Sequence, residues 1–188
     1  MEKSTSIMLT GAPATGKSTL ARELVQVLPL ELMPAHTTRP PRENEINGRD
    51  YIFLEKPSFK ARFQNGEYLE PSLWYAWYEG YYYGSPKLWI ARATESSTPI
   101  LFISNNVETA RIVKDNAKDK VAWIHLTANE ESRSDRLKFR GSKQDEIRGR
   151  LERGDTHGIN RIADTNIDTS EIDLTETIRL VTKFVYQR

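Results

Sequence analysis

The chain has 188 residues, of which 38% are hydrophobic and 28% are charged, and its formal net charge is +1. This length suits one compact domain with insertions, and the balanced charge argues against a long nucleic-acid footprint, which normally carries a basic excess. The sequence has no cysteine, which excludes disulfides, thiolate metal sites and a cysteine nucleophile and fits a cytoplasmic location. It has neither a signal peptide nor an apolar run of about 20 residues, so we expect a soluble protein.

The most informative segment begins directly after the apolar run Ile7–Leu9. Residues 11–18 read GAPATGKS, which is a glycine, four residues and then Gly-Lys-Ser. Glycines let the backbone curl so that its N–H groups face a polyphosphate, and a helix that begins at the loop adds a favourable dipole. In this pattern Lys17 reaches the β- and γ-phosphates and the Ser18 hydroxyl ligates Mg²⁺. The sequence therefore predicts a strand, a phosphate-binding loop and a helix that bind a nucleoside triphosphate.

The rest of the chain alternates between strand and helix patterns. The helix after the loop is predicted over 17–28 and ends at Pro29. Further strands are predicted at 50–54, 100–103 and 121–126 and near 166–168. Further helices are predicted at 57–63, 87–94, 107–116 and 129–153, the last with a break at Gly141-Ser142, and from about residue 174. This alternation predicts an α/β fold with a parallel sheet covered by helices on both faces.

Two arginines lie three residues apart on a proline-rich turn in the run Thr37–Arg42, TTRPPR. A stiff turn of this kind can aim the forked donors of Arg39 and Arg42 at one phosphate with little loss of entropy. Alone, such a pair is usually a solvated basic loop. Beside a phosphate-binding loop, it favours a second phosphate site.

Together these motifs resemble the guanylate kinase family, over nearly the whole chain. Behind the intact loop come TTRPPR at 37–42, GRDY at 48–51, GEYLE at 66–70, YYGS at 82–85, and RLKFRG at 136–141 with Arg150-Leu151, all in family order. Each fragment is weak alone, but the ordered series is specific.

The resemblance implies a residue for each part of a phosphoryl transfer. The acceptor is expected to contact Arg39, Arg42, Tyr51, Glu70, Tyr83, Ser85 and Asn106. ATP is expected to contact Gly11, Ala14, Thr15, Gly16, Lys17, Ser18, Thr19 and Arg140. The catalytic residues are expected to be Lys17, Arg39, Arg136 and Arg150, with Ser18 as the metal ligand. In this scheme the Glu70 carboxylate accepts hydrogen bonds from guanine N1–H and N2–H.

The implied architecture is a P-loop kinase in three parts. The core comprises 1–34, 86–133 and 154–188, the acceptor-binding insertion is 35–85, and a helical lid is 134–153. Closure of insertion and lid would exclude water, so that ATP phosphorylates the acceptor and is not hydrolysed. No side chain has to act as a strong base, because the acceptor phosphate is already ionised.

Some residues depart from the family pattern. Ala35 stands where the family usually has a serine that contacts guanine, and His36 or Thr37 could compensate. Asn106 falls where the family has an aspartate, so a negative charge is missing. Residues 168–170, DTS, replace a Val-Asn-Asp-like stretch around the donor adenine, where small polar groups can still contact the base.

The segment between Glu70 and Tyr83 is longer than the usual family spacing and contains the aromatic run 74–78, WYAWY. This segment is either an elongated hairpin packed on itself or a pocket that encloses a different base or sugar. We favour the hairpin.

The activity that these motifs imply is transfer of phosphate from ATP to a nucleoside monophosphate, with GMP or dGMP as the first candidates. ATP and Mg²⁺ are the expected cofactors, and small nucleotides, not nucleic acid or membrane, are the expected partners. Two alternatives stay open. One is a related kinase for a modified nucleotide or ribose 1,5-bisphosphate, and the other is a non-catalytic interaction module. The sequence does not indicate an oligomeric state.

Overall fold

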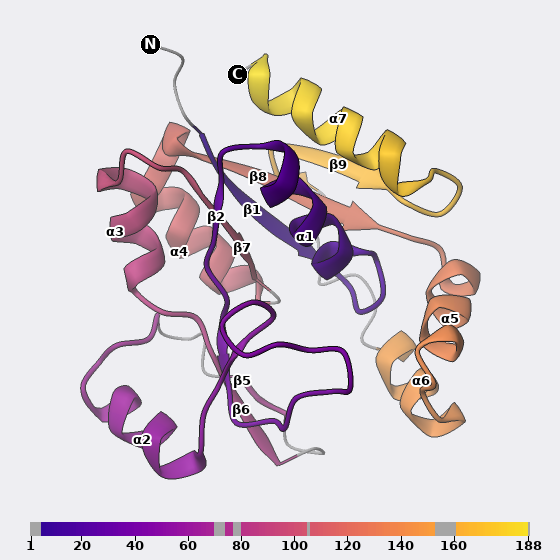
Figure 1. Cartoon of the computed structure of the whole chain (residues 1–188), viewed down its shortest axis with the longest axis horizontal. Coiled ribbons are helices and arrows are strands. Elements are labelled where there is room, and N and C mark those ends of the chain that lie inside the picture. The colour runs from indigo at the N-terminus through magenta and orange to yellow at the C-terminus, as the bar shows by residue number, and fades with distance from the viewer. Residues whose placement is uncertain (1–4, 70–73, 77–79, 105, 153–160, 188) are drawn as a thin grey trace.

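The computed structural model describes residues 5–69, 74–76, 80–104, 106–152 and 161–187, with residues 74–76 described by their backbone alone. Two sheets and the helices that pack on them form the molecule (Figure 1). The larger sheet has five strands, and the smaller sheet has four. The predicted α/β class is therefore confirmed.

All neighbouring strands of the larger sheet are parallel, in the order β2-β7-β1-β8-β9. Its strands are β1 (Ser6–Gly11), β2 (Glu31–Leu32), β7 (Ile100–Ile103), β8 (Val121–Thr127) and β9 (Thr165–Asp168). Strand β1 lies in the middle, with Leu9 opposite Ile103 of β7 and Ile124 of β8. Because parallel strands end at the same edge of a sheet, the loop after β1 opens where ligands of such folds bind.

Helices cover both faces of this sheet. On one face lie α1 (Lys17–Val27) and α7 (Leu174–Tyr186), and on the other lie α3 (Leu88–Glu95) and α4 (Val107–Ala117), which is followed by a 3-10 turn at Lys118–Lys120 (Figure 1). Alternation along β1 supplies both cores: Ile7 and Leu9 pack under α1 and α7, whereas Met8 packs under α3 and α4. The predicted two-sided parallel sheet is confirmed.

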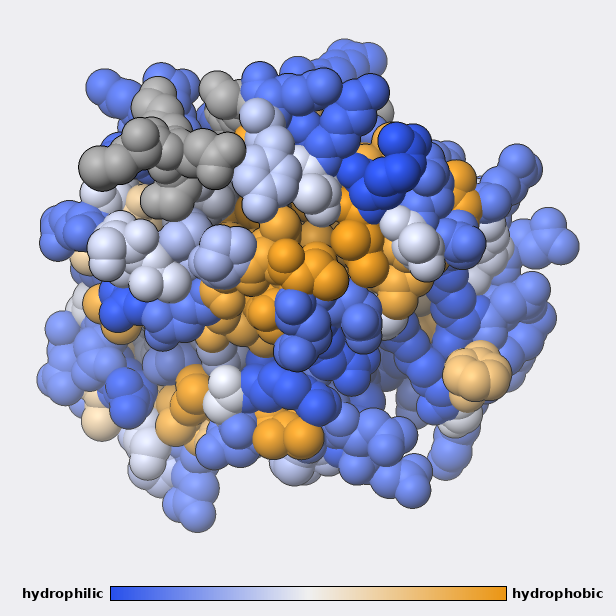
Figure 2. All heavy atoms as spheres, turned by 45° about the horizontal axis from the view of Figure 1, so that its top comes forward, coloured by the Kyte–Doolittle hydropathy of each residue, from blue (hydrophilic) through white to orange (hydrophobic). Residues whose placement is uncertain are grey.

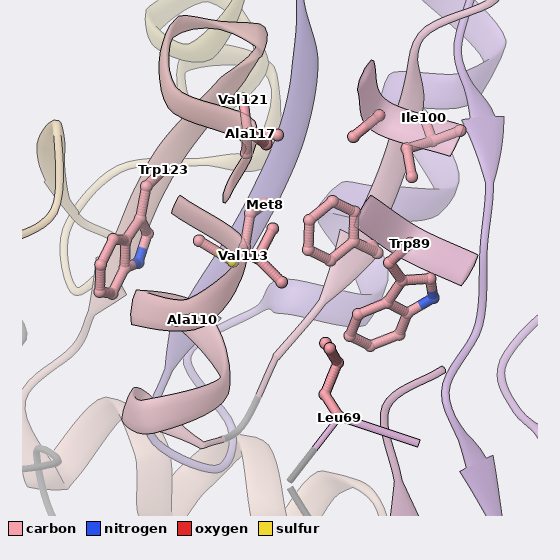
Figure 3. Close-up of a cluster of buried hydrophobic side chains, with 11 residues drawn as sticks. Met8, Leu69, Trp89, Ile100, Ala110, Val113, Ala117, Val121 and Trp123 are labelled. Atoms are coloured by element: carbon pink, nitrogen blue, oxygen red, sulfur yellow. The ribbon is translucent and has the colours of Figure 1, made fainter. Parts of the chain in front are cut away.

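The core under α3 and α4 contains two buried tryptophans (Figure 3). Trp89 packs on Phe102 with ring centroids 4.8 Å apart. Trp123 donates its indole N–H to Thr10 Oγ1 at 2.8 Å, and Thr10 Oγ1 lies 2.9 Å from Nδ1 of the buried His125. The indole N–H of Trp123, the Thr10 hydroxyl and Nδ1 of His125 therefore have hydrogen-bond partners. These bonds hold β1, the strand that carries the phosphate-binding loop, firmly in the sheet.

The smaller sheet has the order β4-β3-β6-β5. Its strands are β3 (His36–Thr37), β4 (Ile52–Phe53), β5 (Trp74–Ala76) and β6 (Tyr81–Gly84), and α2 (Lys56–Gln64) follows β4. The predicted strand at 50–54 is correct in place but shorter, and the two-residue strands β2 and β3 were not predicted. Strands β5 and β6 pair antiparallel, as the favoured hairpin requires. The other aromatic residues of that hairpin, at 77–78, lie outside the described residues.

Two further helices, α5 (Glu130–Phe139) and α6 (Gln144–Glu152), stand at the end of the larger sheet that carries the loop after β1 (Figure 1). The chain leaves α5 at Gly141-Ser142, so the predicted break is confirmed. Leu137 of α5 and Ile147 of α6 are buried against Ala14 of the loop. This small apolar cluster docks the helical pair on the phosphate-binding loop.

Hydrophilic side chains dominate the surface, with hydrophobic side chains gathered in the middle of the face shown in Figure 2. Among the described helices, none combines the length and the apolar character that a membrane span requires.

Candidate active site

The loop after β1 needs its two glycines for different reasons. Gly11 has a φ of +148°, and a Cβ there would lie 2.3 Å from the carbonyl oxygen of Leu126 on the neighbouring strand β8. Gly16 has a φ of +97° and is the N-terminal cap of α1, a conformation that L side chains rarely adopt. The loop therefore turns from β1 into α1 as the sequence predicts, with the helix N-terminus positioned to favour a polyphosphate.

Lys17 lies inside this loop and is only 8% exposed. Its Nζ donates to the carbonyl oxygens of Gly11 at 2.7 Å and Ala12 at 2.8 Å. Burial, and after it the positive charges of Arg140 and Arg133, lower the pKa of Lys17 to about 7. A bound triphosphate would offset both causes, because its negative charge favours the ammonium form.

The loop also includes Ala14 and Thr15, which were predicted to contact ATP. Both are buried, and the Thr15 hydroxyl donates to the Ala12 carbonyl at 2.9 Å. Ala14 has a φ of +66°, in the left-handed region that a non-glycine residue seldom occupies. The side chains of these two residues therefore shape the loop, which leaves their backbone N–H groups as the groups with which they can contact a phosphate.

Two arginines of α5 tie this helix to the phosphate-binding loop. Arg133 is buried and donates from Nε to Pro13 O at 2.9 Å and from Nη2 to Arg150 O at 2.8 Å. Arg136 donates from Nη1 to Ala14 O at 3.2 Å. Arg136 was predicted from its family position, whereas Arg133 was not, and a buried arginine on a helix of low hydrophobicity left no signal in the sequence.

The arginine that was predicted to anchor the acceptor is held in place before any ligand arrives. Nη2 of Arg39 lies 2.8 Å from Oε2 of Glu45, and Nη1 donates to Pro40 O at 2.7 Å. The guanidinium also lies over the rings of Tyr51 at 5.5 Å and Phe53 at 5.7 Å. Burial is the largest single effect and lowers the pKa of Arg39, but the hydrogen bond and the charge of Glu45, together with Tyr83 and Tyr51, outweigh burial in sum, so the pKa of Arg39 is raised.

Glu45 joins both predicted phosphate ligands. Its Oε2 accepts from the backbone N–H of Arg42 at 2.8 Å, and Nη1 of Arg42 lies 3.5 Å from its Oε1. Sequence reasoning missed Glu45, although a carboxylate three residues after Arg42 was a visible signal. Tyr83 completes the group, with its ring 6.1 Å from that of Tyr51 in an edge-on arrangement. Burial and Tyr83 raise the pKa of Tyr51, so its hydroxyl stays protonated and can donate to a phosphate.

Arginines from different segments converge beside this anchor. Desolvation lowers the pKa of Arg140, and the charges of Arg42, Arg136, Arg150 and Arg22 lower it further. Arg42 lies in the turn after β3, Arg136 on α5, Arg150 on α6 and Arg22 on α1. Among the described residues Arg140 has no carboxylate partner, whereas Arg150 is bonded to Ser142 Oγ at 3.0 Å. Such a concentration of positive charge favours binding of polyanions.

A pocket links the phosphate-binding loop to the acceptor insertion. It lies between the first turns of α1 and the segment at 49–51, and an adjoining groove contains Thr19. The pocket is lined by Ser18, Ala21, Arg22, Leu32, Met33, Pro34, Ala35, Arg49, Asp50, Tyr51 and Ile103. The structure thus brings the predicted metal ligand Ser18 and the predicted acceptor ligand Tyr51 to one cavity.

His36 does not offer a free substitute for the serine missing at Ala35. Its Nδ1 lies 2.9 Å from the Tyr68 hydroxyl, and the two rings meet edge-on at 5.4 Å. Burial, with a smaller effect from Arg62, lowers the pKa of His36 to about 4, so the imidazole is neutral at physiological pH. The His36–Tyr68 pair belongs to the packing of the smaller sheet.

Thr37 does not compensate either. It is fully buried, its hydroxyl donates to Tyr82 O at 3.0 Å, and the same oxygen accepts from Arg39 N at 3.1 Å. The hydroxyl is therefore used to position Arg39. The hydrogen bonds of His36 and Thr37 are thus used within the smaller sheet and for Arg39, and not in place of the serine missing at position 35.

Other predicted acceptor contacts have mixed outcomes. Asn106 is the N-terminal cap of α4, and its Oδ1 accepts from Thr109 N at 3.0 Å. That structural use was readable from an asparagine directly before a predicted helix. Ser85 is buried just after β6. Glu70 lies outside the described residues.

The segment predicted to surround adenine is organised by its own hydrogen bonds. Asp168 Oδ1 accepts from Ser170 N at 2.8 Å and from Ser170 Oγ at 2.6 Å, and these bonds lower the pKa of Asp168. Thr169 between them is buried and faces the phosphate-binding loop.

Ser18 is exposed on the first turn of α1, directly after Lys17, where a hydroxyl can reach a metal held by a triphosphate. The described residues include no group of three or more His, Asp or Glu side chains that could hold a metal ion. The donor set therefore suits Mg²⁺ that arrives with a nucleotide and takes one protein ligand.

A parallel sheet with a phosphate-binding loop after its central strand, and with arginines of α5 bonded to that loop, defines a P-loop kinase. The family model for guanylate kinase matches residues 3–173. The guanylate kinase of Clostridium tetani is 31% identical over 146 residues, which span 78% of this chain and 68% of that enzyme. The guanylate kinase of Lactobacillus acidophilus is 34% identical over 154 residues, covering 80% and 72%. The chain belongs to the guanylate kinase family.

Solved structures agree on the fold. The guanylate kinase of Anaplasma phagocytophilum superposes with a TM-score of 0.70 at 19% identity, over 100% of this chain and 87% of that one. A gluconokinase from Sinorhizobium meliloti superposes with a TM-score of 0.57 at 13% identity, over 100% and 94%. At these identities the similarity shows a shared P-loop kinase fold.

Proposed function

We propose that this chain transfers the γ-phosphate of Mg²⁺-bound ATP to the phosphate of GMP or dGMP, giving ADP and the diphosphate. The observation that carries the proposal is the preformed anchor of Arg39, Glu45 and Tyr51, joined by one pocket to an intact phosphate-binding loop. A kinase that acts on a phosphorylated acceptor needs two phosphate sites in line, and in this proposal the loop is one and the anchor is the other.

In this proposal each group has a separate role. The loop at 11–19 and Lys17 bind the triphosphate, Ser18 ligates Mg²⁺, and Arg39 with Tyr51 holds the acceptor phosphate. Arg42, Tyr83, Ser85, Glu70 and Asn106 remain the other proposed acceptor contacts, and Arg136, Arg140 and Arg150 the proposed lid contacts. Positive charge from the lid would stabilise the transferred phosphoryl group as its bonds change. The acceptor oxygen is already ionised, so no proton has to be removed before attack.

Base selection in this proposal rests on few groups. Ala35 has no polar side-chain atom, and Thr37 is engaged with Tyr82 and Arg39. Glu70 is then the group that complements the adjacent N1–H and N2–H donors of guanine, with Ser85 as a second contact. A ribose bisphosphate acceptor would not use Glu70, and the guanylate kinase relatives do not favour it.

We also propose the three-part division into a core, an acceptor insertion at 35–85 and a lid at 134–153. The smaller sheet within 35–85, and the contact of α5 and α6 with the loop, support it. A cytoplasmic location is proposed from the absence of cysteine and from nucleotide substrates. The net charge of +1 supports small nucleotides, and not nucleic acid, as partners.

The test is ADP release from Mg²⁺-ATP with GMP, dGMP, AMP, CMP, UMP and ribose 1,5-bisphosphate as separate acceptors. We expect turnover with GMP and dGMP and little with the others. The variant Lys17→Ala is expected to lose at least about 100-fold in kcat, because the transferred charge loses its closest lysine, while its circular dichroism spectrum stays unchanged. Turnover of another acceptor without GMP turnover would overturn the proposed acceptor, and an active Lys17→Ala variant would overturn the proposed mechanism.

A further inference from the structure

Thr169 sits where three parts of the active site meet. It follows β9 directly, is only 5% exposed, and its backbone N–H donates to Thr127 O at 2.9 Å. Its hydroxyl oxygen lies 3.0 Å from Thr15 O in the phosphate-binding loop and 3.1 Å from Thr127 O at the end of β8. A hydroxyl has one proton, so it donates to one of these carbonyls and keeps lone pairs for a donor.

That donor is Arg136 of the lid. Nη1 of Arg136 donates to Thr169 Oγ1 at 2.9 Å, and Nη2 donates to the Thr169 carbonyl oxygen. The guanidinium therefore donates to Thr169 from both terminal nitrogens, and this forked geometry fixes the plane of the guanidinium. A hydroxyl that binds a loop carbonyl on one side and a lid guanidinium on the other couples the loop to the lid.

The same guanidinium reaches the strained residue of the loop. Nη1 of Arg136 also donates to Ala14 O at 3.2 Å, and Ala14 has a φ of +66°. The side chain of Ala14 is buried under Leu137 and Ile147 of the two lid helices. A left-handed alanine is strained and persists only when its surroundings hold it. Here the lid contacts Ala14 both at its carbonyl oxygen, through Arg136, and at its side chain, through Leu137 and Ile147.

We propose that Thr169 is a positioning residue for phosphoryl transfer: its hydroxyl fixes Arg136 against the phosphate-binding loop, so that loop and lid are arranged before the triphosphate binds. Thr169 itself contacts no reacting atom in this scheme. The inference rests on the proposed function, because its catalytic consequence is a higher kcat. Preorganised charge of this kind lowers the barrier because no rearrangement is needed during the reaction.

The test compares Thr169→Val, which keeps the shape and removes the hydroxyl, with Thr169→Ser, which restores it. The matched control is Thr177→Val, because Thr177 is a buried threonine whose hydroxyl donates to Asp173 O at 2.8 Å within α7. We expect kcat with GMP to fall at least about tenfold in Thr169→Val, with the KM for GMP unchanged. Thr169→Ser and Thr177→Val are expected to keep kcat near the wild-type value.

A readout without substrate accompanies the kinetics. Amide hydrogen exchange in segments 11–19 and 130–140 is expected to be faster in Thr169→Val than in wild type, and unchanged in Thr177→Val. If Thr169→Val does not fold, Thr169→Ala and the exchange rates of Thr169→Ser take its place. Wild-type kcat in folded Thr169→Val, or equal losses in Thr169→Val and Thr177→Val, would overturn the inference. Wild-type protein without GMP turnover would instead overturn the proposed function, and the exchange data would still test the loop–lid coupling.

Discussion

The lowered pKa of Lys17 predicts that ATP binding takes up a proton. With a pKa of about 7 in the free protein, about nine-tenths of Lys17 is neutral at pH 8 and about one-tenth at pH 6. The bound triphosphate favours the ammonium form, so binding is expected to take up about 0.9 protons at pH 8 and about 0.1 at pH 6. Above pH 8 the affinity for ATP should fall about tenfold, or about 1.4 kcal/mol, for each pH unit.

The same shift has a defined sign for stability. The folded pKa of about 7 lies below the ordinary lysine value of 10.5, so between these pH values the unfolded chain binds more protons. The contribution of Lys17 to the free energy of unfolding of the free protein therefore rises with pH through this window, and a bound triphosphate should remove that dependence.

Isothermal titration calorimetry of Mg²⁺-ATP at pH 8, in buffers of different ionisation enthalpy, measures the proton uptake directly. At this pH the terminal phosphate, with a pKa of about 6, is already ionised. The control is Lys17→Arg, whose guanidinium stays charged and should show no uptake. An uptake below about 0.3 protons at pH 8 in wild type, or an equal uptake in Lys17→Arg, would refute the reasoning from burial and neighbouring arginines.

Two further variants test the anchor and the loop. Glu45→Ala removes the partner of Arg39 from a pair whose side chains are 8% and 16% exposed. We therefore expect the free energy of unfolding to fall by about 3 kcal/mol, the melting temperature to fall by about 6–12 °C and the KM for GMP to rise at least about tenfold. An unchanged melting temperature and KM would contradict the proposed anchor. Gly11→Ala places a Cβ 2.3 Å from Leu126 O and should abolish the cooperative thermal transition. The control Gly149→Ala, whose Cβ would meet no neighbouring atom within 4 Å, should keep that transition. A normal transition in Gly11→Ala would show that the loop can relax.

The sequence predicted those elements of the fold that show a hydrophobic pattern or contain a known motif. The apolar run Ile7–Leu9 and the helical spacing of α1 predicted the strand–loop–helix unit, because a continuous apolar run is typical of a strand buried on both faces and the spacing marks one buried helix face. Strands β2 and β3 have two residues each, too few to show any period. They form because neighbours far away in the chain, β7 and β6, offer them hydrogen bonds.

For the candidate site, the sequence supplied the residues with family motifs but not their supports. Arg133 acts through a contact that only the folded chain creates, since it binds Pro13 across 120 positions. Glu45 differs, because it lies three residues after Arg42 and its contact with that arginine is local. Thr169 likewise meets Thr15 across 154 positions. Asn106 shows the reverse case, because its place before α4 indicated a helix cap more directly than a ligand contact.

The contacts described for Arg39 in the anchor of Arg39, Glu45 and Tyr51 are made with residues between positions 37 and 53. The base-facing positions of the proposal, 35, 70 and 85, lie on other segments. In the proposed scheme, a substitution at one of these base-facing positions leaves the ion pair of Arg39 with Glu45 in place. We therefore expect such a substitution to alter the preference for a base without removing the contacts proposed to hold the acceptor phosphate.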